Sequence, residues 1–306
     1  MPPKSPIEDP PFTVAVVVQR NVLAVVLWMS GALLAFSATA VAVRALAPRF
    51  SVFEMLALRS GGGVAILLAL ALARTELRRR LLPQRMSTHL ARNAVHFAGT
   101  YAWTLGVTLL PLATVFALEF TAPIWVALLA VLFLREALTV ARVAAVVLGF
   151  LGVLVILRPG LASLQPASLL VLGSAFAFAV TAIITKKLTA TESTYAILFW
   201  MNAMQLVPNL VGSGPGFWSK IDDAAFLPLA TICLGGLLSH FCLTNAYRHG
   251  DATVVVPLDF LRIPLIALVG WQLYGEALDP FVFVGSAAII VGILFNLRAE
   301  TRRRAA

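Results

Sequence analysis

The chain is organised as a series of apolar segments separated by short breaks that contain Arg, Pro or Gly. A helix that crosses a bilayer needs about 20 mostly apolar residues, because the hydrocarbon core is about 30 Å thick. The ten segments that meet this requirement are residues 21–43, 53–73, 91–109, 113–134, 140–157, 167–186, 194–211, 225–246, 252–274 and 279–297. The pattern therefore predicts an all-α integral membrane protein with ten transmembrane helices.

Two of these segments resemble each other. LEFTAPIWVALLAVLFLREAL (118–138) aligns with LDFLRIPLIALVGWQLYGEAL (258–278), so that the acidic residue before Phe and the closing Glu-Ala-Leu coincide. A slightly different offset matches two further pairs, Arg44 with Lys186 and Ser51 with Ser193. Chance similarity between oily helices is the alternative, but the polar residues share one register. Because each half holds five helices, an odd number, the second half enters the membrane from the opposite side. The sequence thus predicts two inverted five-helix repeats, a construction typical of transporters.

The repeat divides the chain into four parts. These are a cytoplasmic N-terminal tail (1–20), a first repeat (21–160), a second repeat (161–298) and a basic cytoplasmic C-terminal tail (299–306).

Composition and charge agree with a membrane protein. Of the residues, 60% are hydrophobic and 12% charged, against about 45–50% and about 25% in soluble domains. Most of the 23 Lys and Arg residues fall in breaks on one side of the predicted membrane, which places both termini in the cytoplasm. The expected location is the cell inner (plasma) membrane. Topology and contact with anionic headgroups explain the net charge of +9, so no nucleic-acid partner is expected.

The arrangement resembles a known family. Two five-helix halves, a Pro in the fourth helix of each, Glu-Ala-Leu after it and a Gly-rich fifth helix are similar to the EamA-type transporters of the drug/metabolite transporter superfamily. The resemblance implies a secondary transporter that exports small metabolites by alternating access around a central cavity. Aromatic or neutral amino acids are the substrates that it suggests.

Ionisable residues inside a membrane are candidate functional residues. Glu119 and Asp259 occupy equivalent places in the two repeats, and Pro123 and Pro264 follow them and are expected to bend the helices. Asp259 either serves gating or simply pairs with Arg262 one turn later. Glu119 has no basic residue at helical spacing, so it either pairs with Arg59 of the second helix or is protonated. These six residues are the predicted gating or coupling group.

Aromatic and polar residues in the third, seventh and eighth helices predict a substrate site. His96, Thr100 and Trp103 recur at helical spacing and share one face. A polar stripe of this kind faces a cavity or another helix, not lipid. The remaining candidates for substrate binding are Trp28, Trp200, His240 and Tyr247.

Enzyme signatures are missing from the sequence. It contains no Gly-rich nucleotide loop, His-Glu-x-x-His or Gly-x-Ser-x-Gly motif, and its four histidines lack metal-ligand spacing. We expect no catalytic residues, cofactor or metal, and a monomer whose partners are a small-molecule substrate and the lipid bilayer. A passive facilitator or channel is the main alternative function, and an intramembrane enzyme is the other.

Overall fold

The computed structural model describes residues 21–110, 112–157, 166–265 and 280–305, and within these ranges the chain forms helices and no strand. The elements are α1 (Val22–Leu46), α2 (Val52–Ala73), α3 (Thr75–Arg79), α4 (Met86–Leu109), α5 (Leu112–Glu119), α6 (Ala122–Leu129), the π-helical η1 (Ala130–Leu134), α7 (Val140–Leu157), α8 (Pro166–Leu188), α9 (Thr194–Gly212), the 3₁₀-helical η3 (Phe217–Lys220), α10 (Asp223–His249), α11 (Ala252–Val255), the 3₁₀-helical η4 (Val256–Leu261) and α13 (Pro280–Ala305).

Five helices in this part of the chain are long and apolar enough to cross a membrane, namely α1, α2, α8, α10 and α13. Two shorter apolar helical stretches, Ala122–Leu134 and Val140–Ile156, add to them. Large apolar side chains such as Leu27, Phe226 and Phe283 are mostly exposed, as expected of a surface solvated by lipid. The all-helical membrane fold is confirmed. The count of ten stays a prediction, because residues 266–279, with Glu276 of the second Glu-Ala-Leu, lie outside the described residues.

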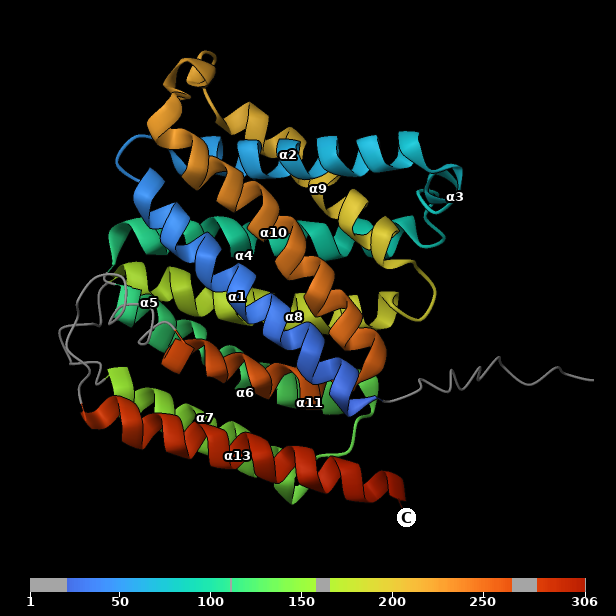
Figure 1. The fold of residues 1–306 in the computed structure, drawn as a ribbon, viewed down its shortest axis with the longest axis vertical. Helices are drawn as coiled ribbons and strands as arrows, with labels where there is room; N and C mark the ends of the chain where they lie inside the picture. The colour runs from blue at the N-terminus through green and yellow to red at the C-terminus, as the bar shows by residue number, and fades with distance from the viewer. Residues whose placement is uncertain (1–20, 111, 158–165, 266–279, 306) are drawn as a thin grey trace, which may run out of the picture.

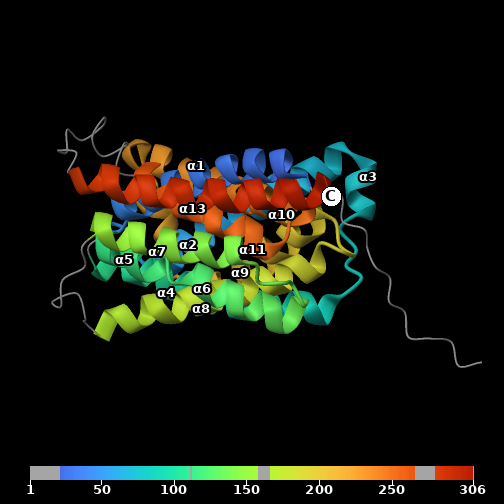
Figure 2. The same cartoon turned by 90° about the horizontal axis from the view of Figure 1, so that it is seen from below.

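The two halves of the chain interlock. Most helices run lengthwise through the molecule (Figure 2), with α1 and α10 inclined to α2, α4 and α8 (Figure 1). The most extensive packing joins α1 to α10, α7 to α13, α4 to α8 and α2 to α9. Figure 1 shows α1 beside α10 and α7 beside α13. Every one of these pairs combines one helix from before residue 158 with one from after residue 165. The repeat equates α1 with α8, α4 with α10, α2 with α9 and α7 with α13. The α1–α10 and α8–α4 pairs are therefore equivalent, and the other two pairs each join a helix to its own counterpart.

Equivalent side chains in the halves make equivalent contacts. Arg44, at the end of α1, donates to the carbonyl oxygens of Val107 and Leu110 at the end of α4. Lys186, at the end of α8, donates in the same way to the carbonyls of Tyr247 and Gly250 at the end of α10. A cation suits a helix C-terminus, where the last carbonyls lack helical partners.

The direction of the helices is inverted between the halves. The backbone N–H of Asn21, just before α1, donates to the carbonyl of His249 at the end of α10. The end of α8 also meets the end of α10 through Lys186. The start of α1 and the end of α8 thus lie at the same end of the molecule, so these matched helices run in opposite directions.

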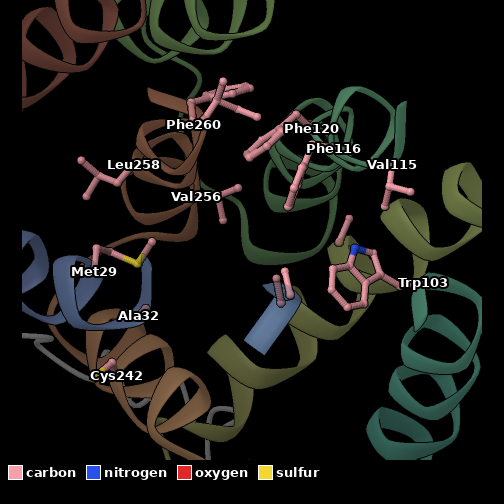
Figure 3. Packing of buried hydrophobic residues seen from close by; sticks show 14 of the residues in the cluster. Met29, Ala32, Trp103, Val115, Phe116, Phe120, Cys242, Val256, Leu258 and Phe260 are labelled. Carbon is pink, nitrogen blue, oxygen red and sulfur yellow. The ribbon is translucent and has the colours of Figure 1, made fainter. Parts of the chain in front are cut away.

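The fourth and ninth predicted helices are broken. α5 ends at Glu119 and α6 begins at Ala122 with Pro123 in its first turn, where the missing N–H of Pro costs no helical hydrogen bond. In the second half, α11 passes into the 3₁₀ turns of η4. The two breaks face each other, because Phe120 and Phe260 stack with ring centroids 5.6 Å apart (Figure 3).

Two boundaries differ from the prediction. α4 begins at Met86, five residues before the predicted start, because one side of its polar first turns, with His89, Arg92 and Asn93, is buried against protein. α13 continues as a helix to Ala305 through the predicted C-terminal tail. There Glu300 accepts a hydrogen bond of 3.1 Å from the buried guanidinium of Arg142, which attaches this end of α13 to α7.

Candidate substrate cavity between the halves

A cavity of about 160 Å³ lies between the two halves. Its walls come from α1, α2, α4, α8 and α10 and from the two broken helices. Most of the lining atoms are apolar, and a small number of charged and polar side chains project among them. This mixture is typical of sites that bind small molecules. The lining includes nine predicted residues, namely His96, Thr100, Trp103, His240, Tyr247, Glu119, Asp259, Arg262 and Arg59.

Arg262 is the centre of a buried ion cluster at one wall. Its Nη2 atom donates to Glu119 Oε1 at 2.6 Å and to Asp259 Oδ2 at 2.9 Å. The other carboxylate oxygen of Glu119 accepts a 2.7 Å hydrogen bond from the indole N–H of Trp103. The local pairing of Asp259 with Arg262 is therefore confirmed. The cluster also links the halves, because Glu119 belongs to the first and Arg262 to the second.

The predicted pairing of Glu119 with Arg59 is wrong. The break after α5 brings Glu119 to η4, so Arg262 becomes its partner. Three aromatic rings, those of Phe36, Phe116 and Phe120, lie 5.1–5.6 Å from the Arg262 guanidinium carbon. Such rings favour a cation over their faces, so the surroundings of Arg262 suit a charged guanidinium and its two acids.

The predicted polar stripe of α4 faces the cavity. The hydroxyl of Thr100 lies 3.4 Å from Nε2 of His96, while His96 Nδ1 has no protein partner within the described residues. The imidazoles of His96 and His240 meet edge to face, with centroids 4.9 Å apart. Phe36 and Phe178 pack on this pair from α1 and α8. The cavity thus offers flat rings and hydrogen-bonding groups side by side.

Four predicted site residues lie outside the cavity wall. Trp200 donates from its indole to the carbonyl of Leu81 at 2.8 Å, so it attaches α9 to the segment after α3. Trp28 packs edge to face on Phe241 at the α1–α10 contact. Pro123 and Pro264 belong to the broken helices and shape the site without lining it.

Several lining residues were missed by the sequence interpretation. Arg92 is not among the predicted site residues, yet it lies in α4 with its side chain buried against Thr185 of α8. Its spacing to His96 and Thr100 places all three on one helix face, and this signal was present in the sequence. The other missed residues, Phe36, Thr39, Thr181 and Thr185, carry no such signal because their helices are apolar on most sides.

Within the described ranges, no group of three or more His, Cys, Asp or Glu side chains is placed to hold a metal ion. The two acids of the cavity wall, Glu119 and Asp259, are instead paired with Arg262, and His96 and His240 pack against aromatic rings.

Comparison with known proteins assigns the chain to a family. The EamA-like transporter family matches it twice, at residues 23–158 and 165–298. A riboflavin transporter of Rhizobium johnstonii (strain DSM 114642 / LMG 32736 / 3841) is 35% identical over 70% of this chain and 71% of its own length. An S-adenosylmethionine uptake transporter of Rickettsia felis (strain ATCC VR-1525 / URRWXCal2) is 29% identical over 72% and 75%.

A solved crystal structure shares the fold. It covers 92% of this chain and 99% of its own, with a TM-score of 0.74 and 17% sequence identity. The double family match falls on the two interlocked halves, and the cavity lies between them. The protein is therefore a member of the EamA-like transporter family, built from two copies of the family's repeat.

Proposed function

We propose that this protein is a secondary transporter that carries a small, ring-containing metabolite across the membrane by alternating access. The observation that supports this most strongly is the cavity between two interlocked, inverted halves, with broken helices from both halves in its wall. In transporters of this construction, the substrate site lies at the repeat interface beside discontinuous helices. Rocking of one half against the other then exposes the site to each side in turn.

The lining favours a substrate with a flat ring. Trp103, Phe178 and the imidazoles of His96 and His240 all border the cavity. Aromatic amino acids, predicted from the sequence, carry such a ring, and so do riboflavin and S-adenosylmethionine, for which the two relatives are named. A flat ring with polar substituents is therefore the common feature that we propose for the substrate.

The cavity volume supports a conformational cycle. At about 160 Å³, the space resembles an engineered cavity of about 150 Å³ that holds benzene. It fits one aromatic ring, but a molecule of the size of riboflavin requires the halves to separate further.

Purified protein in liposomes tests the proposal. Labelled riboflavin, S-adenosylmethionine, phenylalanine and tryptophan are offered to vesicles preloaded with the same compound, with protein-free vesicles as the control. We expect saturable counterflow of at least one compound. Export, predicted from the sequence, stays a prediction, and the relative from Rickettsia is named for uptake. Flux is for this reason measured in both directions. No saturable flux of any of the four compounds would contradict the proposal.

A passive facilitator is separated from a secondary transporter by the same vesicles. Uphill accumulation that follows an imposed H⁺ or Na⁺ gradient requires coupling, whereas a facilitator only equalises concentrations. The buried acids Glu119 and Asp259 at the cavity wall favour coupling, because intramembrane carboxylates commonly serve proton or ion relays.

A further inference from the structure

Two cations in the cavity wall differ from the ion-paired arginines Arg262 and Arg142. Arg262 is paired with two carboxylates, and Arg142 is paired with Asp251 and Glu300. Arg59 and Arg92 also lie in transmembrane helices and line the cavity. Among the residues that the structure describes, neither of them has a carboxylate partner.

Arg59 reaches the cavity across the surface of α10. A Cβ atom placed on Gly236 would lie 2.4 Å from Nε of Arg59. The glycine therefore leaves the space through which the guanidinium passes beside the helix. Any larger residue at 236 would displace the side chain, because such a short contact is sterically forbidden.

Arg92 is held in place by neutral groups. Its Nε donates to the hydroxyl of Thr185 at 3.1 Å, and its Nη1 donates to the amide oxygen of Asn93 at 2.9 Å. These bonds orient the guanidinium without neutralising it. Its Nη2 atom makes no hydrogen bond to another described residue.

The local charge balance is positive on this side of the cavity. The Arg262 cluster contains one cation and two acids, while the other described lining residues, among them Arg59, Arg92, His96, His240 and Tyr247, include no carboxylate. An unpaired buried charge is costly, by several kcal/mol per ion, and charges kept inside a membrane mark substrate or ion pathways. A guanidinium is planar and presents a fork of N–H donors that matches carboxylate and phosphate oxygens.

We infer that Arg59 and Arg92 form an anion subsite, which binds a carboxylate or phosphate group of the substrate while the aromatic lining holds its ring. This inference rests on the proposed transport function and adds the charge of the substrate to it. The substrate class is a ring-containing metabolite with at least one anionic group. The neutral acceptors Thr185 and Asn93 hold Arg92 in position for that group.

Matched pairs of small probes test the subsite. Benzoate is compared with benzamide for a carboxylate, and phenyl phosphate with phenol for a phosphate. Each contains one ring, which suits a cavity of about 160 Å³. The melting temperature of the purified protein is titrated with each probe at constant ionic strength. We expect one anion to bind roughly tenfold to a hundredfold more tightly than its neutral partner, as hydrogen bonds to charged groups allow.

Variants assign the effect to the two arginines. Arg59→Gln and Arg92→Gln are expected to remove the preference for the anion, and the Lys variants to keep part of it. Arg302→Gln, at an exposed position near the end of α13, is the matched control and should behave like the parent. Should a Gln variant fail to fold, the comparison of the probes on the parent protein still tests whether the cavity prefers an anion.

The outcomes separate this inference from the proposed function. Equal binding of both members of both pairs, or no binding of either anion, overturns the anion subsite even if riboflavin or an amino acid is transported. An anion preference that persists in both Gln variants overturns the role of the two arginines. Absence of saturable flux, with anion preference intact, contradicts the transport function alone.

Discussion

At the scale of single residues, the Arg262 cluster has a clear hierarchy. The side chain of Arg262 is 4% exposed, that of Glu119 is 10% exposed, and that of Asp259, which lines the cavity, is 26% exposed. Among the described residues, Glu119 accepts from two donors, Arg262 and Trp103, whereas Asp259 accepts from Arg262 alone. Arg262 is therefore the member whose loss leaves most charge unpaired.

Substitution of Arg262 should be the most damaging change in this cluster. Arg262→Leu leaves two acids without their cation and should destabilise the fold by about 3–5 kcal/mol. Glu119→Gln should cost less, and Asp259→Asn least, because Arg262 keeps one acid in either case. Melting temperatures of the three variants check this order, and a double change of Glu119 and Asp259 tests whether their effects are coupled. Additive effects of equal size would contradict a shared cation.

Trp103 combines two roles that one substitution separates. Trp103→Phe keeps a ring against the cavity but removes the indole N–H that donates to Glu119. A lost hydrogen bond to a charged group corresponds to about 1.5–3 kcal/mol. We expect folded protein with altered transport, seen as a changed maximal rate or dependence on the ion gradient. Trp28→Phe, outside the cavity wall, is the control, and equal transport by both variants would make the Trp103 bond structural only.

At the scale of elements, the two ends of the molecule are closed by different contacts. At one end, Arg142 pairs with Asp251 and Glu300, and all three side chains are at most 8% exposed. Glu136 adds bonds to the N–H groups of Ala252 and Thr253 at the start of α11. A carboxylate at a helix N-terminus satisfies free N–H groups and complements the helix dipole.

The opposite end is joined by pairs whose cations are more exposed, namely Lys220 with Glu54 and Arg49 with Asp222. Arg49 and Asp222 meet at 2.7 Å with side chains 41% and 52% exposed. The hydrogen bond from Arg49 lowers the pKa of Asp222, so the contribution of this pair is present at neutral pH and is lost as the pH falls through the lowered pKa. Exposed pairs stabilise little. The end with Glu136 is therefore the more firmly closed one in this conformation.

Removing the Glu136 contact should open that end. With the native cysteines replaced by Ala, Thr181→Cys places a thiol in the cavity wall. In inside-out membrane vesicles, an impermeant thiol reagent should label this cysteine faster when Glu136→Ala is added. Glu76→Ala, at an exposed position on α3, is the matched control. Unchanged labelling in the Glu136 variant would show that these bonds do not hold the end closed.

The positions of helices follow from the sequence, while contacts across the cavity do not. Apolar length and breaks located α1, α2 and α9 within a few residues. The start of α4 was missed because its first turns are polar, and hydropathy takes no account of the neighbouring helices α8 and α9, which Arg92 and Asn93 contact. The pairing of Glu119 with Arg262 joins residues 143 apart. Spacing along the sequence predicts ion pairs within one helix. The pair of Glu119 with Arg262 forms because two broken helices pack together, which local spacing does not predict.

At the scale of the whole molecule, the predicted orientation can be measured directly. Gly214 follows α9, and a Cβ there would meet nothing within 4 Å. Leu82 follows α3, near the start of α9, and is 77% exposed. In a background without native cysteines, Gly214→Cys should react with an impermeant reagent outside intact cells, and Leu82→Cys should react only after permeabilisation. The reverse pattern would invert the topology.

The interlocked halves have a consequence for how the protein is made. Because α1, α2, α4 and α7 find their main partners in the second half, the first half leaves the ribosome with Arg59 and Glu119 still lacking their final surroundings. The first half remains in the membrane without its main packing partners until α8 to α13 are synthesised. A gene cut after residue 160 should therefore yield two fragments that are degraded when expressed singly and accumulate when expressed together. Stable accumulation of either fragment alone, seen by immunoblot, would contradict this dependence. Selection then acts on the assembled protein, so that a substitution at the contact surface of one half requires a compensating substitution in the other.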